Sequence, residues 1–259
     1  MTVSDVPVFT LARAGSMTVV QAAGDVTYVF GPNLSLRRLG QSWWFLPASR
    51  DLVWLVDGTS FQPGADLRVR QVDLRDTEVL RSVRVPAGQR PIAGQRDRLL
   101  LKDVGTLRWW DPATGVTQSM HDHVLAVSAG ATVVCRDRCH TVDVHDDTGT
   151  RVARLHMERR VVAAAPAPDD HAVALLTDAA DTTASSLVIA DLDRRTLHPV
   201  AGGAPLVSRR LLTWSPNGAF VFFATLDGRL GVLDRSSETT HRVDVDLDDV
   251  DAMAAFAGP

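Results

Sequence analysis

Residues 211–245 decide the fold, and they read LLTWSPNGAFVFFATLDGRLGVLDRSSETTHRVDV. Apolar and polar residues alternate through four short runs, as they do in strands that have one buried face. Two Gly-containing segments and a turn at Asp234 separate these runs, and such residues favour tight turns. The stretch therefore predicts four antiparallel strands, at Leu211–Trp214, Ala219–Ala224, Arg229–Asp234 and Thr239–Val245.

A turn that begins with aspartate recurs along the chain. In each copy an Asp ends one alternating run, and a few polar residues with Ser, Thr or Gly separate it from the next run. The side chain of such an Asp can accept hydrogen bonds from its own backbone, which favours a hairpin. The copies stand roughly 35 to 45 residues apart, a period typical of repeated structural units. They lie at Asp73, Asp111, Asp146, Asp191 and Asp234.

The same four runs can be drawn around each turn. The chain therefore predicts an all-β fold, a β-propeller of about six four-stranded antiparallel blades. We expect one propeller domain over residues 1–259, because closed all-β architectures commonly reach this length as a single unit. A further apolar run at 250–256 predicts a strand that closes the first blade, and the alternative is a truncated seven-bladed propeller.

Two short motifs and one duplication connect the chain to known repeats. Residues 159–166 match residues 209–216 with the same proline offset. Trp214-Ser-Pro-Asn-Gly218 resembles the strand-end signature of the WD40-like, YVTN-like and quinoprotein-like propeller repeats, and Asp111-Pro-Ala-Thr-Gly115 resembles their outer hairpin. The Gly-His pair of true WD40 repeats is absent, and Trp110-Asp111 is the only Trp-Asp pair. The resemblance covers nearly the whole chain and implies the fold, but no particular function.

The charge balance bears on partners and location. The formal net charge is -4, with 27 Lys and Arg against 31 Asp and Glu, so we expect no nucleic-acid partner. Lys102 is the only lysine, a usage typical of GC-rich bacterial genes. No apolar run approaches the roughly 18 residues of a membrane span, and the first residues lack the layout of a signal peptide. We therefore expect no membrane span and a cytoplasmic location, with a periplasmic or extracellular one open if a leader was removed.

One end of the strands is the candidate binding face. In a meander of four strands, the loops between second and third strands lie at the same end as the connections between blades. This end collects the long loops 57–66 and 178–186, and loops held on a rigid scaffold commonly carry binding residues. Guanidinium groups suit carboxylate or phosphate ligands, and their alternative role is to form salt bridges between blades. The candidate binding residues are Arg159, Arg160, Arg209, Arg210, His121 and His123.

Two function classes follow from this reading. The first is a non-catalytic interaction scaffold or sensor module that binds a protein or peptide, an anionic one if the arginine pairs are used. The alternative is a propeller hydrolase of the lactonase type with a divalent metal in the central channel, whose resemblance implies Glu and Asn ligands. Asn33 and Asn217 both occur in turn sequences, and the sequence shows no nucleophile or phosphate-loop motif. We predict no catalytic residue, no metal site and no cofactor, and the oligomeric state stays open.

The two cysteines, Cys135 and Cys139, flank three residues of a predicted hairpin loop. Residues that close such a loop face each other across the strand ladder, roughly 4.5 to 5.5 Å apart at Cα, which a disulfide tolerates. A disulfide that closes so short a loop stabilises the folded chain by only about 2 kcal/mol, and it is labile in a reducing cytosol. We therefore expect free thiols, with a disulfide as the alternative.

Overall fold

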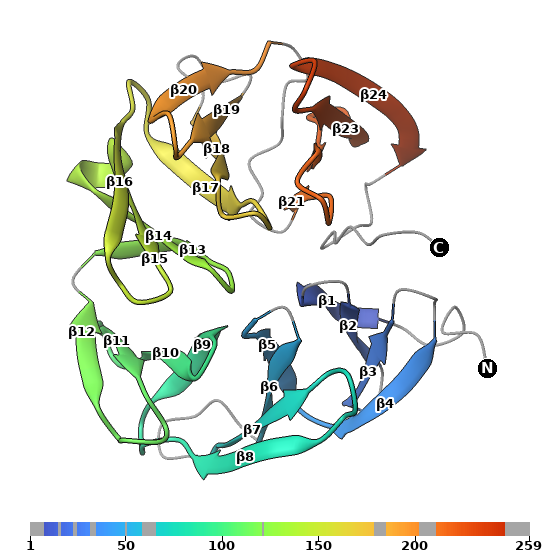
Figure 1. Ribbon diagram of the computed structural model, residues 1–259, viewed down its shortest axis with the longest axis vertical. Helices are drawn as coiled ribbons and strands as arrows, with labels where there is room; N and C mark the ends of the chain where they lie inside the picture. Colours follow the sequence, from blue (N-terminus) through green and yellow to red (C-terminus); the bar gives the residue numbers. More distant parts are fainter. Residues whose placement is uncertain are drawn as a thin grey trace. The chain divides into compact units, whose positions relative to one another are not determined.

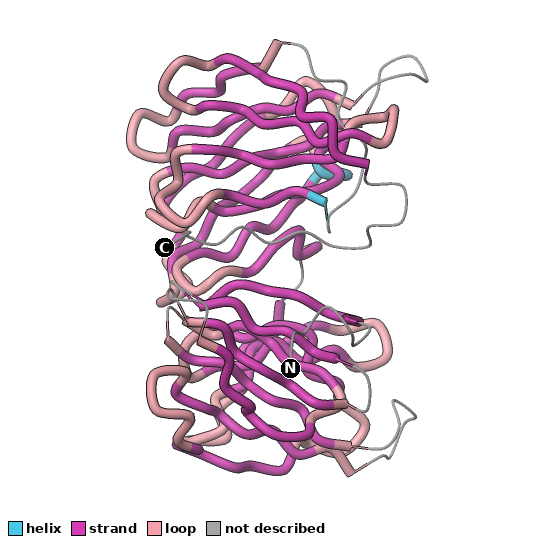
Figure 2. Tube along the Cα trace, turned by 90° about the vertical axis from the view of Figure 1, so that its right-hand side faces the viewer, coloured by secondary structure: helices cyan, strands magenta, loops and turns pink. Residues whose placement is uncertain are grey.

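The computed structural model describes residues 8–14, 17–22, 25–31, 35–49, 51–58, 66–120, 122–178, 185–201 and 211–246. These residues form six four-stranded antiparallel sheets, each with its strands in chain order (Figure 1). The described chain contains very little helix, and its one complete helical turn is the 3-10 turn η2 (Asp137–Cys139) (Figure 2). The prediction of an all-β propeller with six four-stranded blades is confirmed. The run 250–256 lies outside the described residues.

The described chain divides into two compact units between His121 and Asp122, and each unit holds three blades. The first unit has blade 1 with β1 (Val8–Ala14), β2 (Met17–Ala22), β3 (Val26–Phe30) and β4 (Leu36–Gln41). Blade 2 has β5 (Trp44–Pro47), β6 (Leu52–Asp57), β7 (Arg68–Asp73) and β8 (Val79–Arg84). Blade 3 has β9 (Arg90–Gln95), β10 (Arg98–Lys102), β11 (Leu107–Trp110) and β12 (Thr117–Met120).

The second unit repeats this plan. Blade 4 has β13 (His123–Val127), β14 (Ala131–Arg136), β15 (Thr141–Asp146) and β16 (Arg151–His156). Blade 5 has β17 (Val161–Pro166), β18 (Ala172–Thr177), β19 (Ser186–Asp191) and β20 (Thr196–Pro199). Blade 6 has β21 (Leu212–Trp214), β22 (Phe220–Ala224), β23 (Arg229–Asp234) and β24 (Thr239–Asp246). The strands expected within 211–245 agree with these bounds to within one residue.

The recurring aspartates connect the third and fourth strands of blades 2 to 6, as the repeat predicts. Asp111 Oδ1 accepts the Ala113 N–H at 2.8 Å, and Asp234 Oδ1 accepts the Ser236 N–H at 2.8 Å. Backbone N–H and hydroxyl donors stabilise the charged carboxylate, so the pKa of Asp111 and of Asp234 lies below its ordinary value. The turn chemistry that reveals the repeat is therefore a set of real hydrogen bonds.

Blades pack through apolar faces, with a few polar contacts that set their spacing. Between blades 2 and 3, Trp54 Nε1 donates to the Arg96 carbonyl at 3.1 Å. Between blades 5 and 6, Trp214 Nε1 donates to the Ala165 carbonyl at 2.8 Å. The strand β18 is buried along its whole length because neighbouring blades cover both of its faces. This explains why the middle strands read as nearly continuous apolar runs.

Loops between second and third strands lie beside the connections between blades, as expected. The Met157 N–H donates to the His140 carbonyl at 2.8 Å, and the Val85 N–H donates to the Leu67 carbonyl at 2.8 Å. Most of the loops 57–66 and 178–186 falls outside the described residues. No helix in the described chain is long and apolar enough to cross a membrane.

Candidate functional site

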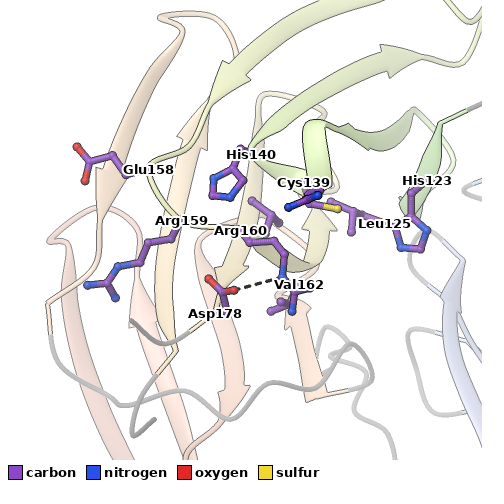
Figure 3. A pocket seen from close by; sticks show the side chains of 11 residues that line it. His123, Leu125, Cys139, His140, Glu158, Arg159, Arg160, Val162 and Asp178 are labelled. Carbon is purple, nitrogen blue, oxygen red and sulfur yellow. Dashed lines mark hydrogen bonds and ion pairs between the residues drawn. The ribbon is translucent and has the colours of Figure 1, made fainter. Parts of the chain in front are cut away.

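An open pocket of about 940 Å³ lies on the predicted loop face of the second unit, where blades 4 and 5 meet (Figure 3). The start of β13 and the β14–β15 loop form one side of it. The connection from β16 to β17 and the end of β18 form the other side. The lining residues are His123, Leu125, Arg138, Cys139, His140, Glu158, Arg159, Arg160, Val161, Val162 and Asp178.

The pocket combines an apolar floor with a charged rim. Leu125 and Val161 belong to the buried core shared by blades 4 and 5, so the floor is fixed by packing. The rim carries three guanidinium groups against two carboxylates, a formal net charge of +1 with both imidazoles neutral. The surrounding chain is net negative, at -4 overall. The pocket is therefore a local positive site on an acidic protein.

Arg160 is the guanidinium with the clearest geometry. Its Nε lies 3.2 Å from Asp178 Oδ2, and the two side chains are 54% and 40% exposed. Both residues belong to blade 5, where the Asp178 N–H also donates to the Arg160 carbonyl at 2.8 Å. An exposed ion pair of this kind stabilises by at most about 1 kcal/mol. The two terminal nitrogens of Arg160 form no hydrogen bond with a described residue.

Arg159 is oriented differently from Arg160. Figure 3 shows its side chain extending away from Cys139 and His123. Its Nη1 donates to Ser186 Oγ at 3.3 Å, at the start of β19. Arg159 therefore lines the edge of the pocket, whereas Arg160 reaches into it.

The β14–β15 loop contributes Arg138 and His140, which the sequence did not single out. Arg138 is exposed and forms no ion pair or hydrogen bond with the described part of the chain. His140 Nδ1 lies 3.3 Å from the Met157 carbonyl, which ties the loop to the β16–β17 connection. The signal that finds these residues is the strand order, because the loop between the second and third strands of blade 4 lies beside the connection to blade 5.

The expectation of free thiols is wrong, because Cys135 and Cys139 form a disulfide with their Cα atoms 4.7 Å apart. They do not face each other across the ladder. Cys135 pairs with Val142 in the β14–β15 register, and Cys139 lies inside the loop. A left-handed turn brings it back, with positive φ angles of 50°, 55° and 69° at Asp137, Arg138 and Cys139. Strand register alone could not place this cysteine.

Three of the six candidate residues are described, namely His123, Arg159 and Arg160, and the pocket brings them together. His121, Arg209 and Arg210 lie outside the described residues, so their part in a site stays a prediction. The alternative role of the arginine pairs was to form salt bridges between blades. Arg160 does form a salt bridge, and its partner is Asp178. That pair lies within one blade, not between blades.

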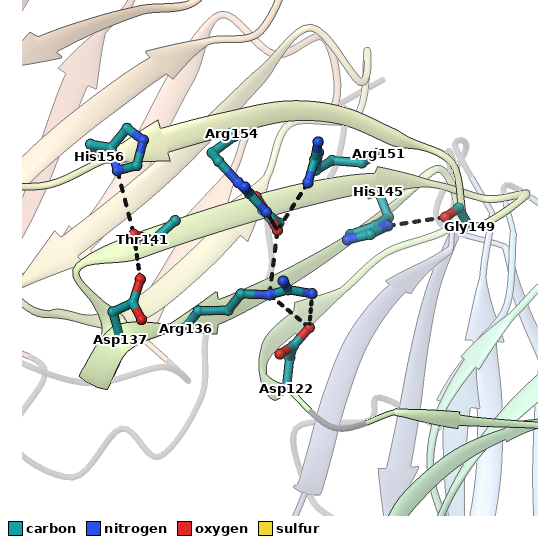
Figure 4. A network of polar contacts seen from close by, with 10 residues as sticks. Asp122, Arg136, Asp137, Thr141, His145, Gly149, Arg151, Arg154 and His156 are labelled. Carbon is teal, nitrogen blue, oxygen red and sulfur yellow. Dashed lines mark hydrogen bonds and ion pairs between the residues drawn. The ribbon is translucent and has the colours of Figure 1, made fainter.

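A second charged cluster lies on blade 4, outside the pocket (Figure 4). The carboxylate of Asp143 is fully buried and accepts two hydrogen bonds from Arg154, at 2.7 and 2.8 Å. Arg136 and Arg151 approach it to 3.5 and 3.8 Å. The hydrogen bonds from Arg154 hold the pKa of Asp143 below its ordinary value. Each group in this cluster has an internal partner, which indicates a structural role.

No three His, Cys, Asp or Glu side chains of the described chain are grouped so as to hold a metal ion.

No family model and no curated protein matches this sequence. Solved structures do match its fold. The first is KlHsv2 with loop 6CD replaced by a Gly-Ser linker, with 12% identity and a TM-score of 0.66 over 98% of this chain and 87% of that one. Hsv2 from Kluyveromyces marxianus has 10% identity and a TM-score of 0.60 over 93% and 82%. Oligogalacturonate lyase in complex with manganese has 16% identity and a TM-score of 0.58 over 88% and 74%.

These similarities place the chain among the β-propellers and concern the fold alone, because the identities are low. Of the three structures named here, one is a lyase and two are Hsv2 proteins, and a shared fold does not imply a shared function. The function of this chain has to be argued from its own pocket.

Proposed function

We propose that this chain is a non-catalytic binding module that holds an acidic segment of a partner protein in the pocket between blades 4 and 5. The observation that carries this proposal is the pair Arg138 and Arg160. Both guanidinium groups line the pocket, and each has donors that no described residue uses. Guanidinium forks form short, strong hydrogen bonds with carboxylates.

The floor of the pocket supports a peptide rather than a free small anion. Val162 is only partly buried and offers apolar surface beside the charged rim, and the almost completely buried Leu125 and Val161 support the pocket from the core. An extended peptide points successive side chains to opposite faces, so alternating residues can engage the rim and the floor. A segment that mixes Asp or Glu with aliphatic residues fits both features. Long polyanions fit less well, because the rest of the chain is net negative.

The test uses fluorescence anisotropy with a short labelled peptide that alternates Asp and Leu. We expect the wild-type chain to bind this peptide and to bind its Asn–Leu counterpart far more weakly. The double substitution Arg138→Gln and Arg160→Gln should weaken binding about a hundredfold or more, because each of the two lost charged hydrogen bonds costs about 1.5 to 3 kcal/mol. The melting temperature should stay within about 2 °C, because both side chains are exposed.

The matched control is Arg195→Gln, which removes the same charge from an exposed turn between β19 and β20 of blade 5, outside the pocket. Affinity should be unchanged in this variant. An equal loss in the control variant, or equal binding of the Asn–Leu peptide, would contradict the proposal. Competition by inorganic phosphate but not by acetate would instead make phosphate the ligand.

A further inference from the structure

We propose that the disulfide between Cys135 and Cys139 is a redox switch for the binding pocket. This inference rests on the proposed function, since the property it controls is the affinity for the acidic segment. Cys139 lines the pocket and lies next to Arg138 on one side and His140 on the other. The bridge therefore sits inside the loop that presents two of the rim side chains.

The loop has a conformation that its sequence does not favour. Asp137, Arg138 and Cys139 all have positive φ angles, and none of them is glycine. In a residue other than glycine this conformation is disfavoured, because the side chain comes too close to the backbone. Three consecutive residues keep it only where other contacts enforce it. The disulfide ties the end of this turn to β14. Asp137 adds two hydrogen bonds, because its carboxylate accepts from Thr141 Oγ1 at 3.0 Å and its carbonyl accepts from the His140 N–H at 3.2 Å.

The bridge is open to reaction from the pocket side. Cys135 is 3% exposed, whereas Cys139 is only partly buried and lines the pocket. A dithiol reductant attacks Cys139 Sγ, so that the sulfur–sulfur bond breaks and Cys135 leaves as a thiolate that takes up a proton. The second thiol of the reductant then releases Cys139 and closes a cyclic disulfide. Two electrons and two protons pass to the protein, and the reductant is oxidised.

Reduction removes the cross-link but leaves the hairpin. The β14–β15 ladder runs from Ala131 to Arg136 and closes with the pair Arg136 and Thr141, so it does not need the bridge. The residues between them are then held only by the hydrogen bonds of Asp137 and His140, so the turn leaves the left-handed region more readily than in the oxidised protein. Arg138 moves with these residues. The guanidinium groups of Arg138 and Arg160 are then no longer held in the one arrangement that binds an acidic segment. Binding loses the benefit of a preorganised site.

The test compares the affinity for the Asp–Leu peptide in oxidised and reduced protein. We expect dithiothreitol to weaken binding about three- to tenfold, with a melting temperature shift below about 5 °C. The double variant Cys135→Ser and Cys139→Ser should bind like the reduced protein and should not respond to dithiothreitol. In Arg138→Gln the response to reduction should nearly disappear, because the side chain that the bridge positions is gone.

The outcomes separate this inference from the proposed function. Intact mass after alkylation should show no label before reduction and two labels after it. Two labels without reductant, or equal affinity in both states, would overturn the switch while the binding module stands. An affinity of the serine double variant equal to that of the oxidised protein would do the same. Absence of peptide binding in both states would overturn the proposed function and the switch with it.

Discussion

We expect the substitution Asp143→Asn to lower the free energy of unfolding by about 2 to 3 kcal/mol. This is one of the largest effects that we expect from a single substitution in this chain. The carboxylate is fully buried and holds three arginines, with Arg154 bound through two hydrogen bonds. Asparagine removes the counter-charge of Arg151 and Arg154, whereas Arg136 keeps its contact with Asp122. The cost stays below that of a fully buried pair, because the arginine side chains are 38% to 48% exposed and can be hydrated.

The pH dependence of this effect has a definite sign. The pKa of Asp143 in the folded chain is lowered from 3.8, chiefly by its hydrogen bonds with Arg154. Its contribution to stability is therefore complete above the unfolded value and is lost as the pH falls through the folded pKa. The stability difference between wild type and Asp143→Asn should be constant near neutral pH and should shrink below about pH 3.8.

Chemical denaturation at a series of pH values measures both quantities. Asp122→Asn is the matched control, because Asp122 contacts Arg136 of the same cluster at 2.7 Å but is 25% exposed. Its effect should stay below about 1 kcal/mol. Equal losses in the two variants would show that burial of Asp143 is not what makes its charge important.

Gly231→Ala is the second substitution with a large expected effect, a loss of about 2 to 3 kcal/mol from overpacking. Gly231 in β23 is directly opposite Phe223 in β22, and a Cβ at this glycine would lie 2.4 Å from the phenyl ring. Phe223 is completely buried between blades 5 and 6. The ring is packed in the core of blades 5 and 6, so relief of this contact requires its neighbours or the sheet to shift.

Two variants isolate the role of this contact, both followed by denaturant unfolding. Gly149→Ala has no atom near its new methyl group but has a φ of +90°, so it should cost only about 1 to 2 kcal/mol from backbone strain. Phe223→Leu combined with Gly231→Ala should cost less than the sum of the single changes, because the smaller side chain relieves the clash. Strict additivity would show that the phenyl ring does not determine the cost.

The sequence could predict the fold because its signals are local. Alternating apolar and polar residues indicate strands. The turns that begin with Asp indicate hairpins, because their hydrogen bonds span only a few residues. Both signals recur with one period, which is why the blades and their strand bounds agree with the structure. The loop face followed from the same meander order.

The site could be predicted only in part from the sequence. Arg159 and Arg160 were found through the duplication of 159–166 in 209–216, and His123 through its proximity to a second histidine. These three residues lie in one pocket with Arg138 and Asp178 only because a loop of blade 4 packs beside strands of blade 5. Residues 138 and 160 are far apart in sequence, so no local pattern connects them. The proposed roles of Arg209, Arg210 and His121, and the single domain over 1–259, stay predictions.

The sequence by itself determined that this protein has about six four-stranded blades, because hydrogen bonds and side-chain alternation act over a few residues. Only the tertiary structure decided which side chains meet. The left-handed turn that brings Cys139 to Cys135, the arginines around Asp143 and the phenyl ring over Gly231 all depend on packing between strands. Such packing is set by side-chain shape and burial in three dimensions, which short-range patterns do not encode.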